Sequence, residues 1–171
     1  MDDESKQEQG TRLSHLRKAE DGSRSEARMV DVSEKPVTAR RALATASVRF
    51  PPGLLDGLLA KGGPKGPIEE VARVAGIQAA KRTGELIPMC HPLGLDLCDV
   101  RFRASGDVLE VRCEVRCSGR TGVEMEALTG ASVAALTVID MTKALTKDLR
   151  VEEVRLLEKD GGKSGSWRAS R

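Results

Sequence analysis

A helix of small residues that leads into a proline-rich turn constrains the fold of this chain more than any other segment. Residues 73–83 read RVAGIQAAKRT, and the basic pair that closes this run suits a helix C-terminus. The small side chains let another backbone approach closely. Residues 87–93 follow with IPMCHPL and hold His91 between Cys90 and Pro92. A helix end beside a polar turn predicts that this segment lines a pocket.

Length and composition limit the possible functions. The chain has 171 residues, enough for one domain with a single core and a tail. Its 28 Lys and Arg against 26 Asp and Glu leave a net charge of +2, and aromatic residues make up 2%. Stacking platforms for nucleic acid are therefore not expected. Because apolar runs fall short of the roughly 20 residues of a membrane span and the N-terminus is acidic, we predict a soluble, cytoplasmic protein without a membrane partner.

The N-terminal segment differs from the rest of the chain. Residues 1–28 mix acids and bases with Ser, Gln and Gly and show no apolar period. Such a composition cannot offset the entropy of ordering. We predict a disordered tail over 1–28, which includes His15, and a single domain over 29–171. Ordered structure is expected to begin near Met29–Val32.

Apolar periodicity predicts an α+β domain. Alternation predicts strands over 41–50, 97–104 and 108–117, with a hairpin at 105–107 and a last strand over 154–157. Composition predicts helices over 54–61, 68–83 and 126–147, with a Gly/Pro loop at 62–67. Strands and helices show no repeating βαβ period. We therefore expect an antiparallel sheet with helices packed on one face.

The cysteines do not predict a metal site. They lie at 90, 98, 113 and 117, in a chain where reduced thiols are expected. Cys113 and Cys117 fall four residues apart on one predicted strand, about 13 Å at 3.3 Å per residue. That spacing is too wide for one ion, so we expect no Cys/His metal centre.

Two carboxylates precede the long predicted helix. Residues 120–126 read RTGVEME and present Glu124 and Glu126 close together. The alternative interpretation is a capping box in which Thr121 pairs with Glu124. Spacing alone leaves both interpretations open.

Asp140 and Lys143 are neighbours on one face of the same helix. A surface ion pair is the simpler interpretation, because pairs three residues apart contribute about 0.2–0.5 kcal/mol in many helices. However, Asp140 follows the apolar run 134–139. We therefore expect a partly desolvated carboxylate with a raised pKa, suited to proton transfer.

A glycine-rich strip near the C-terminus could contact phosphate. Residues 161–165 read GGKSG and resemble half of a P-loop, although the full Walker spacing is absent. Lys159, Lys163 and Lys65 lie on or near Gly-rich loops and can bind phosphate oxygens; each alone could equally be solvated surface. Together with the carboxylates and His91, they suggest a site for an anionic substrate that requires proton transfers.

Six motifs in order resemble one known family. They are MVDVS at 29–33, AGIQAAK at 75–81, CHPL at 90–93, GVEMEALT at 122–129, Asp140-Met141 with Lys143-Ala144, and GGKSG at 161–165. The chain from about residue 29 onward is similar to the cyclic pyranopterin monophosphate synthases, the molybdenum cofactor biosynthesis protein C family.

This resemblance implies a fold, an assembly and a reaction. The fold would be ferredoxin-like, in a homohexamer built as a trimer of dimers with active sites at subunit interfaces. The family is a phosphorus–oxygen lyase that converts 3′,8-cyclo-7,8-dihydroguanosine triphosphate, made by a radical-SAM GTP 3′,8-cyclase, into cyclic pyranopterin monophosphate and diphosphate. The sequence indicates no required cofactor, and it leaves open whether Mg²⁺ accompanies the triphosphate.

The resemblance also assigns the site residues. By motif, the catalytic residues are Asp140, Lys143, Lys65 and Lys159, and the substrate-binding residues are Met89, Cys90, His91, Glu124, Met125, Glu126, Lys163 and Arg40. The family usually has an acid where Pro67 stands here, which bears on the reach of Lys65. Two other classes stay open: a non-catalytic oligomeric nucleotide-binding protein, and a Cys-dependent or metal hydrolase using Cys90 and His91.

Overall fold

The computed structural model describes residues 16–18 and 25–170, and the chain divides into two units, Met1–Asp31 and Val32–Arg171. In the first unit, strand β1 (Leu16–Lys18) pairs antiparallel with β2 (Ser25–Ala27), which the sequence did not predict. Residues 1–15 and 19–24 of the predicted disordered tail, His15 included, lie outside the described residues. Residues 28–32 lead out of β2 without regular structure.

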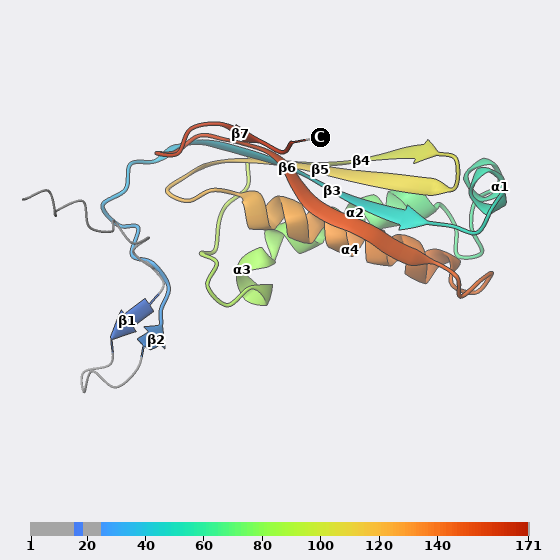
Figure 1. The fold of residues 1–171 in the computed structure, drawn as a ribbon, viewed down its shortest axis with the longest axis horizontal. Helices are drawn as coiled ribbons and strands as arrows, with labels where there is room; N and C mark the ends of the chain where they lie inside the picture. The colour runs from blue at the N-terminus through green and yellow to red at the C-terminus, as the bar shows by residue number, and fades with distance from the viewer. Residues whose placement is uncertain (1–15, 19–24, 171) are drawn as a thin grey trace, which may run out of the picture. The chain divides into compact units, whose positions relative to one another are not determined.

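The second unit follows a βαββαβ pattern in which three helices stand between the first two strands, and a short extra strand follows the last one (Figure 1). In chain order it contains β3 (Thr38–Arg49), α1 (Leu54–Lys61), α2 (Ile68–Lys81), α3 (Thr83–Leu86), β4 (Leu97–Ser105), β5 (Val108–Gly119), α4 (Glu124–Thr142), β6 (Arg150–Asp160) and β7 (Trp167–Arg168). The sheet order is β4-β5-β3-β6-β7, and every neighbouring pair is antiparallel. This arrangement is the ferredoxin-like α+β fold that the sequence predicted.

The core lies between the sheet and two long helices. α4 packs against β3, β5 and β6, and α2 packs against α4 and β4. The buried face of β3 consists mostly of alanines, and that of β5 of Leu109, Val111, Cys113, Val115 and Cys117, as the period-two pattern predicted. Small residues on β3 let the helix backbone lie close to the sheet.

Two glycines set the distance between α2 and α4. A Cβ on Gly76 would come 2.9 Å from the Gly130 carbonyl oxygen, and one on Gly130 would come 3.2 Å from the Gly76 carbonyl oxygen and 2.6 Å from the Cys113 sulfur of β5. Real Cβ atoms do not approach other atoms this closely. The small-residue helix therefore packs backbone to backbone, as its composition predicted.

Several element boundaries differ from the prediction. α4 ends at Thr142 rather than near Lys147, because the chain tightens into a turn in which the Leu145 N–H donates to the Thr142 carbonyl at 2.9 Å. β6 is more than twice as long as the predicted 154–157 strand. The prediction was too short because exposed charged residues interrupt the apolar pattern of this strand. β7 was not predicted; it pairs through only two residues with β6. The predicted helix 68–83 breaks at Arg82 into α2 and α3.

Strand β4 forms one edge of the sheet, and within the described residues β5 is its one strand neighbour. Arg73 of α2 reaches over this edge. Its Nη1 donates to the Val100 carbonyl oxygen, and its guanidinium lies 5.3 Å from the centre of the Phe102 ring. The side chain thus occupies a backbone acceptor that would otherwise face outward from the edge.

Candidate active site

Three of the predicted catalytic residues form an ion-paired cluster at the C-terminal end of α4. Lys143 Nζ lies 2.5 Å from Asp140 Oδ1, and Lys65 Nζ lies 2.7 Å from Asp140 Oδ2. Lys65 is held in a loop whose base is closed by reciprocal backbone hydrogen bonds between Gly63 and Gly66 at 3.1 and 3.0 Å. Pro67 in this loop therefore does not keep Lys65 from the cluster.

The environment of Asp140 is the opposite of the expected one. Its side chain is 52% exposed, because it points away from the buried face of α4. Hydrogen bonds from Lys143 and Lys65 lower its pKa from the ordinary value of 3.8 to about 2. The predicted raised pKa is thus wrong. Since the pKa is depressed, both ion pairs are present at neutral pH and are lost only as the pH falls through about 2.

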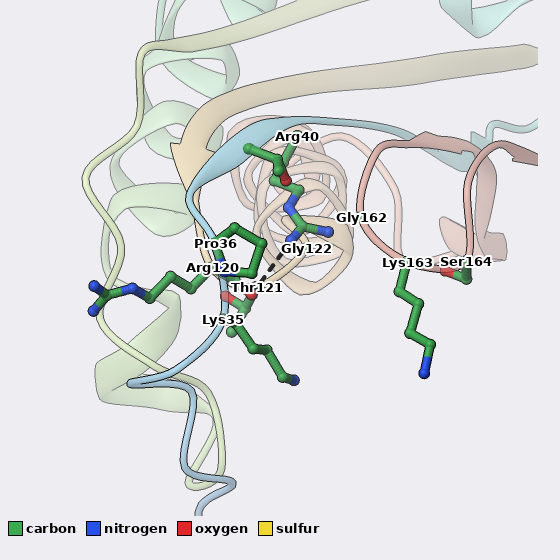
Figure 2. A pocket seen from close by; sticks show the side chains of 10 residues that line it. Lys35, Pro36, Arg40, Arg120, Thr121, Gly122, Gly162, Lys163 and Ser164 are labelled. Carbon is green, nitrogen blue, oxygen red and sulfur yellow. Dashed lines mark hydrogen bonds between the residues drawn. The ribbon is translucent and has the colours of Figure 1, made fainter.

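A cationic pocket of about 1000 Å³ lies at the other end of α4. Its charged lining residues are all basic: Lys35, Arg40, Arg120 and Lys163. Figure 2 shows Lys35 and Lys163 extending in the same direction from two sides of the pocket, while the Arg120 guanidinium points away from Arg40. Such a lining favours a polyanion over a neutral ligand.

Arg40 is fixed at the wall of this pocket. Its Nε donates to the Gly119 carbonyl and its Nη2 to the Arg120 carbonyl, both at 3.3 Å. A Cβ on Gly162 would collide with the guanidinium, and Gly162 has a φ of +73°. Glycine is therefore required there for both space and backbone conformation.

The glycine-rich strip closes a hairpin between β6 and β7. Gly165 donates from its N–H to the Gly162 carbonyl at 3.1 Å, and Lys159 Nζ donates to the Ser164 hydroxyl. Lys163 and Ser164 line the cationic pocket. The hairpin thus brings Lys159 and Lys163 to the pocket region with Arg40.

The two predicted carboxylates stand at the start of α4, and they do not form the alternative capping box. α4 begins at Glu124 with Val123 as its N-cap residue, so Thr121 lies two residues too early to cap it. The Glu124 carboxylate instead occupies the space beside Gly122 that a Cβ there would fill. Glu126 is only 4% exposed, and burial raises its pKa, with a further contribution from the charge of Glu124.

The turn that carries Met89, Cys90 and His91 lies near Glu126. Burial raises the pKa of Cys90, and the charge of Glu126 raises it further. Burial likewise raises the pKa of Cys117; the charge of Glu126 raises it further, whereas the charge of Arg40 lowers it. α3 supports this turn: a Cβ on Gly84 would come 3.1 Å from Pro92 Cα. Met125, the remaining predicted residue, is 38% exposed at the first turn of α4.

The lining residues of the pocket that the sequence did not identify as site residues include Lys35, Pro36, Thr38 and Arg120. Lys35 follows the first motif by two residues, and Arg120 opens the segment that carries the two carboxylates. Their closeness to those motifs was the available signal. Only the sheet reveals the connection, because β3 pairs Thr38 with Gly119.

Among residues 16–18 and 25–170, no group of three His, Cys, Asp or Glu side chains is arranged to hold a metal ion. In the same residues, no helix has both the length and the apolar character needed to cross a lipid bilayer.

The fold and the site define a class of protein: ferredoxin-like α+β domains that combine a cationic pocket with closely paired acidic and basic groups. The MoaC family model matches residues 29–162, and the chain belongs to this family. It is 52% identical over 157 residues to the cyclic pyranopterin monophosphate synthase of Chloroflexus aggregans, covering 91% of this chain and 92% of that protein. It is 51% identical over 144 residues to the protein of the same name from Novosphingobium aromaticivorans, covering 84% and 92%.

Glu126→Gln is expected to stabilise the protein at neutral pH while reducing activity. Burial raises the pKa of Glu126, so folding is favoured while the group is protonated, and this contribution is lost as the pH rises through the folded-state pKa. The Tm of the variant should exceed that of the parent at pH 8, and the difference should disappear in acid. Activity should fall about ten- to hundredfold if the carboxylate hydrogen-bonds substrate.

Calorimetric melting between pH 5 and pH 8 checks the stability effect. Glu85→Gln, at an exposed acid of α3, serves as the control and should show no pH-dependent gain. A variant that is less stable than its parent across the whole range would contradict the assignment of a destabilising buried charge.

Proposed function

We propose that this protein is a cyclic pyranopterin monophosphate synthase of molybdenum cofactor biosynthesis. It converts 3′,8-cyclo-7,8-dihydroguanosine triphosphate into cyclic pyranopterin monophosphate with release of diphosphate. Membership of the MoaC family and the names of its two relatives support this function. The observation that carries it is the combination of a cationic pocket with a separate Lys–Asp–Lys cluster.

The cationic pocket suits the triphosphate. Arg40 can bind phosphate oxygens through its planar fork, and Lys35 and Lys163 add mobile point charges. Lys159 stands next to the pocket through its contact with Ser164. These groups neutralise the charge of the departing diphosphate without a covalent intermediate. Any Mg²⁺ would arrive bound to the triphosphate, since the charged pocket groups are cations.

The Lys65–Asp140–Lys143 cluster suits proton transfer during ring opening and closure. Because the pKa of Asp140 is about 2, its carboxylate is ionised at neutral pH and cannot act as the acid. The transferable protons therefore lie on the lysine ammonium groups, which Asp140 orients. The Asp140 carboxylate can also accept a proton transiently, while one of the two lysines donates a proton in the same step.

The distance between the two groups of residues supports an active site shared by two subunits. Glu124 and Asp140 lie 16 positions apart on one straight helix, which corresponds to about 24 Å at 1.5 Å per residue. Figure 1 shows that α4 runs from the end of the sheet with the β6–β7 hairpin toward the end where α1 lies. One copy cannot bring both groups to one substrate ring. A second copy with α4 antiparallel would place its Lys–Asp–Lys cluster at this pocket.

We therefore propose interface active sites, and the resemblance to the family leads us to propose that they lie in a homohexamer organised as a trimer of dimers. The protein would act in the cytoplasm, receiving its substrate from a radical-SAM GTP 3′,8-cyclase.

The direct test is to incubate the protein with the purified product of that cyclase. Pyranopterin should form together with one equivalent of diphosphate, and wild-type protein should turn over repeatedly. A protein that binds the triphosphate but releases no diphosphate would instead be a non-catalytic nucleotide-binding protein. Turnover that is unaffected by thiol alkylation and by chelators would exclude the hydrolase alternative.

A further inference from the structure

Arg41 of β3 joins three strands on the face of the sheet opposite the helices. Its Nη1 lies 2.7 Å from Glu158 Oε2 and 3.1 Å from Asp160 Oδ2, and its Nη2 lies 2.8 Å from Glu114 Oε2. Glu114 belongs to β5, and the other two carboxylates belong to β6. All four side chains are between 21% and 32% exposed, so the network is partly shielded from solvent.

Two of these carboxylates also contact residues on the other side of the glycine-rich hairpin. Glu158 forms an ion pair with Arg168 of β7, which its backbone also faces in the strand register. Asp160 accepts a hydrogen bond from Ser166, which lowers its pKa together with Arg41. Asp160 and Ser166 directly flank residues 161–165. The network therefore ties both ends of the hairpin loop to β3.

Neighbouring residues at the end of β6 lie on opposite faces of the sheet. Lys159 pairs in register with Ala42, which is buried toward the helices, whereas Asp160 pairs with Arg41 on the opposite face. Successive side chains of a strand point to opposite faces. Arg41 and its carboxylates thus contact the hairpin that carries Lys159 and Lys163 from the face of the sheet opposite the helices.

We infer that Arg41 is a positioning residue for the phosphate-binding hairpin: by clamping Glu158 and Asp160 at its base, it holds Lys159 and Lys163 at the cationic pocket. The role of these lysines rests on the proposed function. The clamp matters because Gly161, Gly162 and Gly165 all have positive φ and offer little intrinsic stiffness. A hairpin fixed at its base loses less conformational entropy when it closes on a ligand.

The test compares Arg41→Gln with Arg49→Gln. Arg49 lies on the same strand and the same face and also pairs with a β6 carboxylate, Glu152 at 2.5 Å, but at the end of β3 farthest from the hairpin. Two measurements are made on the full chain: amide hydrogen exchange across residues 161–166, and the Kd for inorganic triphosphate by calorimetry. The KM and kcat for the cyclised nucleotide are measured in parallel.

Arg41→Gln should speed exchange in residues 161–166 roughly three- to tenfold, the range expected when a partly shielded ionic network is lost. The Kd for triphosphate and the KM should rise by a similar factor, with a smaller change in kcat. Arg41→Lys should fall between, because a lysine keeps the charge without the fork. Arg49→Gln should leave all of these values close to those of the parent.

Unchanged exchange in residues 161–166, or an equal effect of Arg49→Gln, would overturn the inference. If Arg41→Gln does not fold, Ser166→Ala removes the contact at the exposed end of the hairpin and should speed the same amides, and its failure to do so would count equally against the clamp. Absence of turnover by the parent protein would reject the proposed function alone, since exchange and triphosphate binding do not require catalysis.

Discussion

Lys143→Ala is expected to lower turnover by about 10²–10⁴-fold, the range that general acid–base groups contribute. Asp140→Asn should have a comparable effect, because Asp140 contacts both Lys143 and Lys65 and its loss releases both ammonium groups. Steady-state diphosphate release measures the rate. Folding and assembly should be unaffected, since the three side chains are about half exposed and do not contribute to the core.

A matched ion pair provides the control for this prediction. Glu70 and Arg73 are also three residues apart on a helix, at 3.2 Å, and Glu70 is exposed. Glu70→Gln should leave the rate near that of the parent. If Lys143→Ala lowers the rate by less than about tenfold, the cluster at the end of α4 is an ordinary surface ion pair.

Two inactive variants should restore each other when they share an oligomer. Asp140→Asn removes the cluster at one end of α4, and Lys163→Ala removes a pocket cation at the other end. A mixed pair of subunits then contains one site with both halves intact. Random pairing makes half of the pairs mixed, and each has one good site of two, so activity should recover to about a quarter of the parent value.

Co-expression with two affinity tags isolates the mixed oligomers for assay. Asp140→Asn combined with Lys143→Ala serves as the control, because both changes remove the same half-site and no intact site can form. Recovery in neither mixture would show that each chain uses its own residues, and the separation of about 24 Å along α4 would then need another explanation.

The central part of the fold could be predicted because local pattern and tertiary structure agree there. The alternation in residues 108–117 matches β5, and the predicted helix 54–61 matches α1. β6 was underestimated because its exposed Glu and Arg residues interrupt its apolar pattern. The end of α4 was misplaced because helix propensity alone does not show the turn after Thr142.

The sequence predicted which residues belong to the candidate site better than it predicted their ionisation. Motifs named Lys65, Asp140 and Lys143, and the structure brings these three together. The direction of the pKa shift of Asp140 was mispredicted because the apolar run before it does not show that its side chain is half exposed and paired with Lys143. The second partner, Lys65, lies 75 residues away in the chain, so its contact with Asp140 depends on the fold. The same limitation applies to Lys35 and Arg120, which become neighbours only through the pairing of β3 with β5.

The contacts of Arg73 with the edge strand β4 affect the tendency of the protein to aggregate in concentrated solution. An edge strand with free backbone groups is a template on which another chain can add a strand and begin aggregation. Arg73 occupies the Val100 carbonyl in the middle of β4 and places a charge against Phe102, so an incoming strand would have to displace a charged side chain before it could pair. The residue that packs α2 against the sheet also protects this edge from fibril-like growth.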